Sequence, residues 1–469
     1  MIFNSYAFAL FLPIVFILYW FVFRTVKKQN LLLLFSSYFF YGWWDWRFLF
    51  LILFSSLVDY VLSHKIEKST CNKQRDLFLL ISLISNLGLL AFFKYFNFFT
   101  DSFSFLMRSL GWEVDSLTLD IILPVGISFY TFQTLSYTID VHRKKIKAST
   151  DVISFFTFVS FFPQLVAGPI ERASNLLPQI NKERKFSNIL FKEGIFQIAM
   201  GFFRKMVIAD NLGKYVDLIY TNPEIYNSSS LLLASIFYAF QIYYDFSGYS
   251  DIAIGVAKLF GFTFNKNFNL PYFSKSITEF WRKWHISLSF WLRDYLYISL
   301  GGNRKGIKIT YRNLMITMLL GGLWHGSSWN FIIWGGIHGA VLCLEKYIFK
   351  IFQTKNFGYV GMLFTFFITV LAWVFFRASS FDDSIMILSE IFSFNFGMPY
   401  IGDINIVITS LMMLTIGLLF DVFLKIKNVS LEDLGSRLNT VKLVLSLTLI
   451  ILLIVLFYST STNFIYFQF

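Results

Sequence analysis

Long apolar runs alternate with short charged segments along most of the chain. Many of the runs approach or exceed the ~20 helical residues that cross about 30 Å of hydrocarbon. The pattern predicts an all-α polytopic membrane protein with about 11–13 transmembrane helices. The runs cover approximately residues 7–23, 31–44, 48–62, 77–99, 191–220, 231–260, 309–323, 331–347, 359–376, 404–424 and 441–457, with a further one ending before 142.

Two stretches depart from this pattern. Residues 152–170 are apolar but contain Pro163 and the pair Gly168-Pro169. Because proline removes a backbone donor and breaks helices, we expect a re-entrant or broken helix that is buried in protein. Residues 265–308 carry too many charges for a lipid-facing helix. The simplest interpretation is an amphipathic helix at the membrane surface, with its tryptophans at the interface.

Composition supports the membrane assignment. Of the 469 residues, 56% are hydrophobic and 14% are charged, against about 25% charged in soluble domains. A water-soluble globular protein and a disordered chain are therefore excluded. The net charge of +12 comes from basic residues in the loops, which is typical of a cytoplasmic face beside anionic lipid and does not indicate nucleic acid binding. The two cysteines, Cys71 and Cys343, form no disulfide framework or metal-binding spacing.

Ionisable residues inside a membrane are costly, so they are candidates for function. The first group lies at residues 243–251, where Asp245, Ser247, Tyr249 and Asp251 interrupt an apolar run. The two aspartates are six positions apart and do not share a helix face, so a paired acid and base is weakly supported. A polar kink that hydrogen-bonds neighbouring helices is the favoured interpretation, and lining of a substrate pocket is the alternative.

The second group lies at residues 277–308. Glu279 and Lys283 have the spacing of a helical ion pair, and His285 is either an ordinary interface histidine or a functional one. The glycine-rich loop 301–306 follows. Its cations could hold an anionic donor by coulombic attraction, or could serve only as a topology signal; the residues concerned are Arg304, Lys305 and Lys308.

The third group surrounds His325. Glycines precede and follow it, and they either let helix backbones approach closely or leave room for a substrate chain. Histidine can take a proton from a hydroxyl near neutral pH. Three of the five histidines, His285, His325 and His338, fall within one short region. This clustering favours a functional role for His325 first, then His285, and least for His338.

Several of these segments together resemble the membrane-bound O-acyltransferase (MBOAT) family, and within it the bacterial AlgI/PatA-like branch of alginate and peptidoglycan O-acetyltransferases. The matching motifs appear in the family's order and cover much of the chain. They lie at residues 42–47, 162–170, 244–251, 281–289, 292–298, 301–306 and 323–326.

The resemblance implies an O-acyltransferase with a ring of helices around a thin centre. It implies His325 as the catalytic residue and His285 as a second one, with no metal and no bound cofactor. It also implies that acetyl-CoA is the cytoplasmic acyl donor and that an extracytoplasmic SGNH-type partner places the acetyl group on a polysaccharide. The candidates for lining the substrate tunnel are Asp245, Ser247, Tyr249, Asp251, Gly322, Trp324, Gly326 and His338.

The organisation of the chain follows from the same observations. We expect one membrane domain over residues 1–469, with a motif-rich catalytic region at 240–340, in the bacterial inner membrane. A transporter or flippase with an intramembrane polar relay is the alternative function, although the sequence shows no internal repeat. The sequence does not indicate which polysaccharide is modified.

Overall fold

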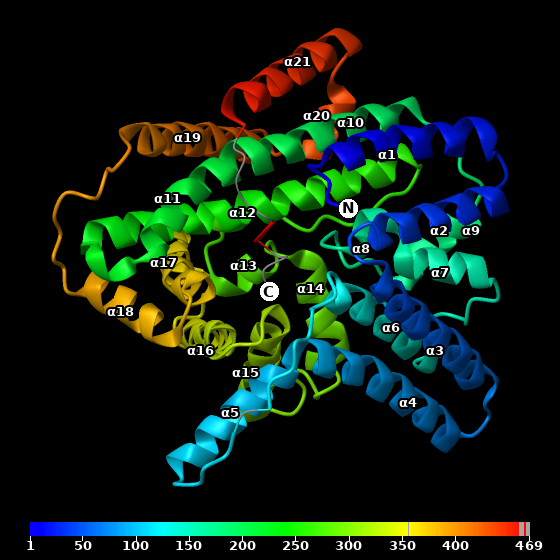
Figure 1. The fold of residues 1–469 in the computed structure, drawn as a ribbon, viewed down its shortest axis with the longest axis horizontal. Helices are drawn as coiled ribbons and strands as arrows, with labels where there is room; N and C mark the ends of the chain where they lie inside the picture. Colours follow the sequence, from blue (N-terminus) through cyan, green and yellow to red (C-terminus); the bar gives the residue numbers. More distant parts are fainter. Residues whose placement is uncertain (116, 355, 459–463, 466–469) are drawn as a thin grey trace. The chain divides into compact units, whose positions relative to one another are not determined.

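The computed structural model describes residues 1–115, 117–354, 356–458 and 464–465. All regular secondary structure in these residues is helical (Figure 1). The chain divides into two compact units. Unit 1 comprises Met1–Asn188 and Ala257–Phe264, and unit 2 comprises Ile189–Val256 and Asn265–Phe469. An all-α fold is therefore confirmed, while the expectation of a single domain stays a prediction.

Unit 1 is a set of helices in which α3 packs against α4 and α6, and α2 packs against α7. Its α-helices are α1 (Tyr6–Ile17), α2 (Val26–Gly42), α3 (Leu49–Lys68), α4 (Asn72–Leu90), α5 (Phe96–Ser109), α6 (Ile127–His142), α7 (Val152–Ser160), α8 (Phe162–Leu165) and α9 (Ala173–Asn181). The short stretches η1 (Leu18–Val22) and η3 (Ala91–Tyr95) are π-helical, and η2 (Trp46–Phe48) is a 3₁₀ turn.

The expected broken helix lies in unit 1. Helix α7 begins at Asp151, whose carboxylate accepts hydrogen bonds from the backbone of Ile153 and Ser154, and the helix ends at Ser160. A new short helix, α8, then starts with Pro163 in its first turn, where the missing N–H costs nothing. Residues 154–155 and 157–171 are buried, so the irregular backbone is enclosed by protein, as predicted.

Unit 2 holds every motif around the three clustered histidines. Its α-helices are α10 (Asn188–Phe202), α11 (Asp210–Thr221), α12 (Ser228–Leu259, the last three residues of which belong to unit 1), α13 (Ile277–Trp281), α14 (Ile286–Trp291), α15 (Ile307–His325), α16 (Trp329–Ile351), α17 (Gly358–Arg377), α18 (Phe381–Phe392), α19 (Ile404–Lys427), α20 (Leu431–Arg437) and α21 (Thr440–Phe457). The π-helical stretches are η4 (Phe203–Ala209) and η7 (Leu292–Tyr297), and the 3₁₀ turns are η5 (Pro223–Ile225) and η6 (Pro271–Phe273).

Two close packings organise unit 2. Helices α15 and α16 form an antiparallel pair around Gly322 and Gly335, where an added Cβ would collide with the opposite backbone. Helix α12 packs in the same way on α10, since a Cβ on Gly248 would lie 2.7 Å from the carbonyl oxygen of Gly201. The small residues therefore let the helices approach to backbone contact.

Within the part of the chain that the structure describes, six helical segments are long and apolar enough to cross a membrane, which supports a multi-pass membrane protein. They are Trp46–Lys68, Asn72–Ser109, Trp329–Ile351, Gly358–Arg377, Ile404–Lys427 and Thr440–Phe457. The first apolar run forms the shorter helix Tyr6–Val22. The expected total of about twelve crossings stays a prediction.

Residues 265–308 differ from the amphipathic surface helix that their charges suggested. The segment is broken into α13, α14 and η7, and its centre is buried in unit 2. Trp284 and His285 are fully buried, and Trp284 packs on Trp373 with ring centres 5.0 Å apart. The interfacial prediction is therefore wrong for Trp284, because aromatic packing in the core outweighs the amphipathic pattern.

Candidate functional site

The two histidines that sequence reasoning ranked highest lie together in unit 2. His325 is the last residue of α15, and His285 directly precedes α14. Their ring centres are 6.3 Å apart, and both side chains are buried. The ring of His325 is enclosed by aromatic side chains, with ring centres at 5.0 Å for Trp324, 5.0 Å for Trp334 and 5.4 Å for Phe376. The structure thus forms a buried two-imidazole centre.

His285 has an unusual backbone conformation. Its φ of 41° and ψ of 55° place it in the left-handed region, which non-glycine residues seldom occupy. Such conformations cost of order 1–3 kcal/mol and persist only where the surrounding structure enforces them, most often at functional sites. The backbone N–H of Ser289 donates to the carbonyl of His285, so the strained residue also starts helix α14. This conformation supports a functional role for His285.

One amide side chain connects His285 to the rest of the site. The Oδ1 atom of Asn267 lies 3.1 Å from Nδ1 of His285, and it accepts a hydrogen bond from the Ser287 hydroxyl at 2.9 Å. The Nδ2 atom of Asn267 donates to the hydroxyl of Ser250 on α12 at 3.1 Å. Asn267 is 1% exposed, so these bonds form away from solvent and are correspondingly strong.

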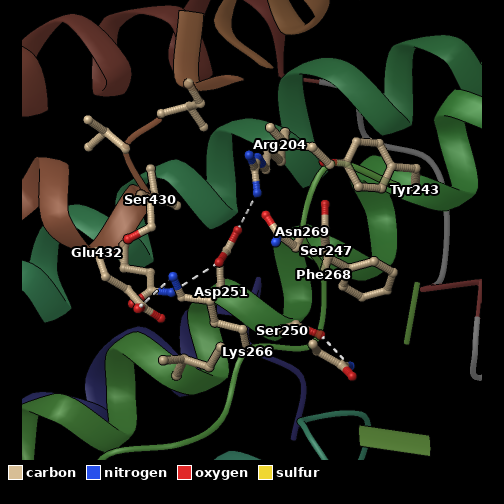
Figure 2. A pocket seen from close by; sticks show the side chains of 17 residues that line it. Arg204, Tyr243, Ser247, Ser250, Asp251, Lys266, Phe268, Asn269, Ser430 and Glu432 are labelled. Carbon is tan, nitrogen blue, oxygen red and sulfur yellow. Dashed lines mark hydrogen bonds and ion pairs between the residues drawn. The ribbon is translucent and has the colours of Figure 1, made fainter. Parts of the chain in front are cut away.

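A polar cavity of about 70 Å³ borders this amide. Figure 2 shows Arg204, Ser247, Ser250 and Asp251 on its walls, with Lys266 and Glu432 also lining it. Ser250 and Asn267 both line the cavity and are hydrogen-bonded to each other. Since Asn267 is also bonded to His285, a chain of two hydrogen bonds leads from Ser250 on the cavity wall to His285.

Helix α20 forms part of the cavity wall. Ser430 caps this helix by accepting a hydrogen bond from the backbone of Asp433. The Ser430 hydroxyl in turn donates to the Asp433 carboxylate at 2.7 Å. This side-chain hydrogen bond and a second one from the Ser430 backbone hold the pKa of Asp433 below its usual range. The cap fixes the first turn of α20, which carries Glu432 to the cavity.

The carboxylates on α12 form ion pairs with cations rather than with each other. Arg204 bonds to Asp251 at 2.6 Å and to Asp421 of α19 at 3.3 Å. Lys205 bonds to Asp245 at 2.6 Å and to Asp210 at 2.7 Å. All of these side chains are largely buried, and buried charges need such partners.

The polar residues do not interrupt α12, since Ser228–Leu259 is one continuous helix, and the expected kink stays a prediction. The expected hydrogen bonds to neighbouring helices are present; Gln197 of α10, for example, donates to Asp251 at 3.0 Å. Ser247 lines the cavity, and the buried ring of Tyr249 lies 4.4 Å from that of Phe464. The polar residues of this segment therefore hold α12 to its neighbours without breaking the helix.

The glycines around His325 serve packing. A Cβ on Gly322 would overlap the backbone of Phe331 on α16, and a Cβ on Gly326 would overlap the Phe331 ring. Of the two alternatives for these glycines, the geometry favours close approach of helices over space for a substrate chain.

His338 is linked to His325 through the ring of Trp334, which contacts both imidazoles. It is fully buried, and its ring centre is 5.0 Å from that of Trp334 and 5.2 Å from that of Trp281. Within the described part of the chain, neither of its ring nitrogens has a hydrogen-bond partner. Trp334 thus lies between His325 and His338. No group of three or more His, Cys, Asp or Glu side chains among the described residues could hold a metal ion.

The three predicted donor-binding cations lie at the start of α15. Arg304, Lys305 and Lys308 are all exposed. The loop before them is held by Asn313, whose amide donates to the carbonyls of Leu300 and Gly302 at 3.2 and 2.9 Å. The cations are therefore presented to solvent from an ordered turn, which suits a soluble anion.

Several important residues were missed by the sequence analysis. Asn267 has no recognisable motif around it, so no pattern pointed to it. Arg204 and Lys205 did carry a signal, because two adjacent cations stood inside an apolar run. Asp421 likewise stands alone within the apolar run of α19. The aromatic residues Trp334 and Phe376 are indistinguishable in the sequence from the many others in the chain.

Together, the helical fold, the six apolar helices and the buried imidazole pair define an integral membrane protein with an enclosed polar site. Residues 142–381 match the model of the MBOAT, membrane-bound O-acyltransferase family. The chain belongs to this family, and it is an acyltransferase.

Individual relatives indicate which branch of the family this chain resembles. The chain is 44% identical to the probable alginate O-acetylase AlgI of Pseudomonas putida, over 84% of this chain and 81% of the relative. It is 37% identical to the peptidoglycan O-acetyltransferase of Helicobacter pylori, over 84% and 80% respectively. It is 30% identical to the teichoic acid D-alanyltransferase of Bacillus subtilis, over 48% of this chain and 60% of that protein. The chain is accordingly similar to O-acetyltransferases of the alginate and peptidoglycan type.

Proposed function

We propose that this protein moves an acetyl group from a cytoplasmic thioester donor across the bacterial inner membrane, for O-acetylation of an extracytoplasmic polysaccharide of the peptidoglycan or alginate type. The observation that carries the proposal is the buried pair of His285 and His325, in a chain similar to polysaccharide O-acetyltransferases. Acetyl-CoA is the proposed donor, and an extracytoplasmic SGNH-type protein is the proposed partner.

His325 is the proposed general base. A neutral imidazole takes the proton from an attacking hydroxyl as the oxygen forms its bond to the acetyl carbon. The carbon–sulfur bond then breaks, and the imidazolium gives this proton to the departing thiolate, which restores the neutral imidazole and releases the thiol. The aromatic rings around His325 exclude water, which would otherwise hydrolyse the thioester. His285 is the second functional group of the same centre.

The donor is proposed to enter near Arg304, Lys305 and Lys308. These cations are exposed and follow an ordered glycine turn, so they can attract the phosphates of coenzyme A without paying to desolvate a buried charge. The remaining tunnel-lining candidates on α12 are proposed to act indirectly. Asp245 and Asp251 hold the helix by ion pairs, while Ser247 faces the polar cavity.

The experiment is acetyl transfer by purified protein in liposomes. Labelled acetyl-CoA is added on one side, and loss of thioester and appearance of acetylated acceptor are followed with and without the partner. Wild-type protein should consume thioester, and His325→Ala should not. If wild-type protein leaves the thioester intact while moving an intact lipid or sugar substrate, the transporter alternative replaces the enzyme. The buried pairs Arg204–Asp251 and Lys205–Asp245 are the feature that would serve such a relay.

A further inference from the structure

We infer that Asn267 positions His285 by holding its imidazole in one tautomer, with the ring proton on Nδ1. Asn267 lies between α12 and α13, outside every motif that the sequence analysis singled out. The inference rests on the proposed function only for its kinetic consequence, because the tautomer itself can be measured without any activity.

The identity of the amide atom that faces His285 follows from its other partners. The backbone N–H of Ser287 points at the same atom of Asn267, at 3.3 Å, and a backbone N–H can only donate. That atom must therefore be the oxygen, Oδ1. The amide nitrogen, on the other side, donates to Ser250. The orientation of the amide is thus determined by a group whose role cannot be reversed.

The tautomer of His285 follows in turn. An amide oxygen only accepts hydrogen bonds, so the Nδ1 atom that lies 3.1 Å from it must be the donor. In a neutral imidazole with its proton on Nδ1, the lone pair is on Nε2. Asn267 therefore presents Nε2 as the nitrogen that can accept a proton.

The backbone makes this arrangement rigid. The N–H of Ile286 donates to the carbonyl of Asn267 at 2.9 Å, and the N–H of Asn269 donates to the carbonyl of Lys283 at 2.9 Å. The chain on both sides of His285 is thereby tied to Asn267 itself and to Asn269, two residues further on. These bonds hold His285 in its left-handed conformation and keep its ring in register with the amide. A positioning group whose backbone is hydrogen-bonded to the segment of the residue it orients can keep a fixed geometry.

The test combines ring ¹⁵N magnetic resonance of the full-length protein with steady-state kinetics. The chain has only five histidines, so the His285 signals are assigned by their loss in His285→Gln. Wild-type protein should show His285 with a protonated Nδ1 and an unprotonated Nε2. A wild-type His285 with its proton on Nε2 would overturn the inference without any further variant.

Two substitutions at Asn267 separate positioning from structure. Asn267→Leu keeps the size but removes the acceptor, so the Nδ1–H pattern should be lost. We expect kcat to fall on the order of ten- to a hundredfold, the magnitude typical of partners that orient metal-binding histidines. KM for the donor should change less than twofold. Asn267→Asp keeps an acceptor, and it should retain the Nδ1–H pattern and recover most of kcat.

The matched control is Asn269→Leu, two residues away on the wall of the same cavity, with an exposed side chain. It should leave the His285 signals unchanged. If Asn267→Leu retains the Nδ1–H pattern, or loses activity with that pattern intact, Asn267 does not position the ring. If wild-type protein shows the predicted tautomer but transfers no acetyl group, the proposed function fails and the positioning role stands.

Discussion

The imidazole rings of His285 and His325 lie 6.3 Å apart with an angle of 60° between their planes, although one residue precedes α14 and the other ends α15. At this spacing a single substrate group can contact both rings. The aromatic side chains around them leave little room for movement. The two histidines are thus held as one centre, and their substitutions should not be independent.

Replacing His325 with Ala should lower acetyl transfer by about 10²–10⁴, the usual cost of losing a general base. The chain should still insert and fold, because the surrounding rings of Trp324, Trp334 and Phe376 also pack on other core residues. The measurement is the initial rate of acetyl transfer by the purified protein in liposomes. The matched control is His64→Ala in α3, which should retain wild-type activity. Full activity in His325→Ala would remove this residue from the mechanism.

Replacing Arg204 with Met should destabilise the protein by about 3–5 kcal/mol, because Asp251 and Asp421 would be left as buried carboxylates without their cation. The measurement is thermal unfolding in detergent. Adding Asp251→Asn and Asp421→Asn to Arg204→Met should recover part of the loss, since the uncompensated charges disappear. The control is Arg47→Met, which removes an exposed ion pair with Asp45 and should leave the melting temperature unchanged. Equal melting temperatures for Arg204→Met and the wild type would contradict a structural role for the pair.

Replacing Gly322 with Ala should destabilise the α15–α16 pair by about 1–3 kcal/mol, since the added methyl group meets the Phe331 backbone. Gly336→Ala is the matched control on α16, because its Cβ would meet only the flexible end of Leu319 at 3.4 Å. Thermal unfolding compares the two. A stable Gly322→Ala protein with blocked acetyl transfer would show instead that this glycine leaves space for a substrate chain.

Neutralising Arg304, Lys305 and Lys308 together should weaken binding of acetyl-CoA, and the wild-type affinity should fall as salt is raised because exposed charges are screened. Binding can be measured by calorimetry at two ionic strengths. The control is a triple substitution to the opposite basic residue in each case, Arg to Lys and Lys to Arg, which keeps the charge. Unchanged affinity in the neutral variant, with the membrane orientation of the protein preserved, would mean that these residues act only as a topology signal.

The sequence was sufficient for the helical membrane fold and the broken helix at α7–α8. It also singled out His285 and His325, which the structure brings together, while their catalytic roles stay predictions. Each depends on a pattern visible in the sequence: hydrophobic length, a proline position, glycines around His325, or the clustering of three of the five histidines. The predicted ion pair between Glu279 and Lys283, with 2.7 Å between Oε1 and Nζ, likewise follows from the spacing of two residues in one segment. These features need no knowledge of what lies opposite in space.

The missed features depend on contacts between distant segments. Asp421 meets Arg204 only because α19 packs beside η4, and Asn267 meets His285 only because two irregular segments run side by side. The burial of Trp284 is of the same kind, since its core partner Trp373 belongs to α17. The hydrophobic pattern within one segment does not depend on which distant segment packs against it. These contacts therefore cannot be predicted from a single sequence.

The left-handed backbone of His285 has a consequence for engineering this protein. Glycine or asparagine would adopt φ 41° and ψ 55° with less strain than histidine. The His285 ring is fully buried and packs on Phe246 and Trp324, so a smaller side chain would relieve the strain but leave a cavity in the core. Glycine at position 285 therefore offers no simple route to a more heat-resistant protein, and libraries built for stability should hold this position constant.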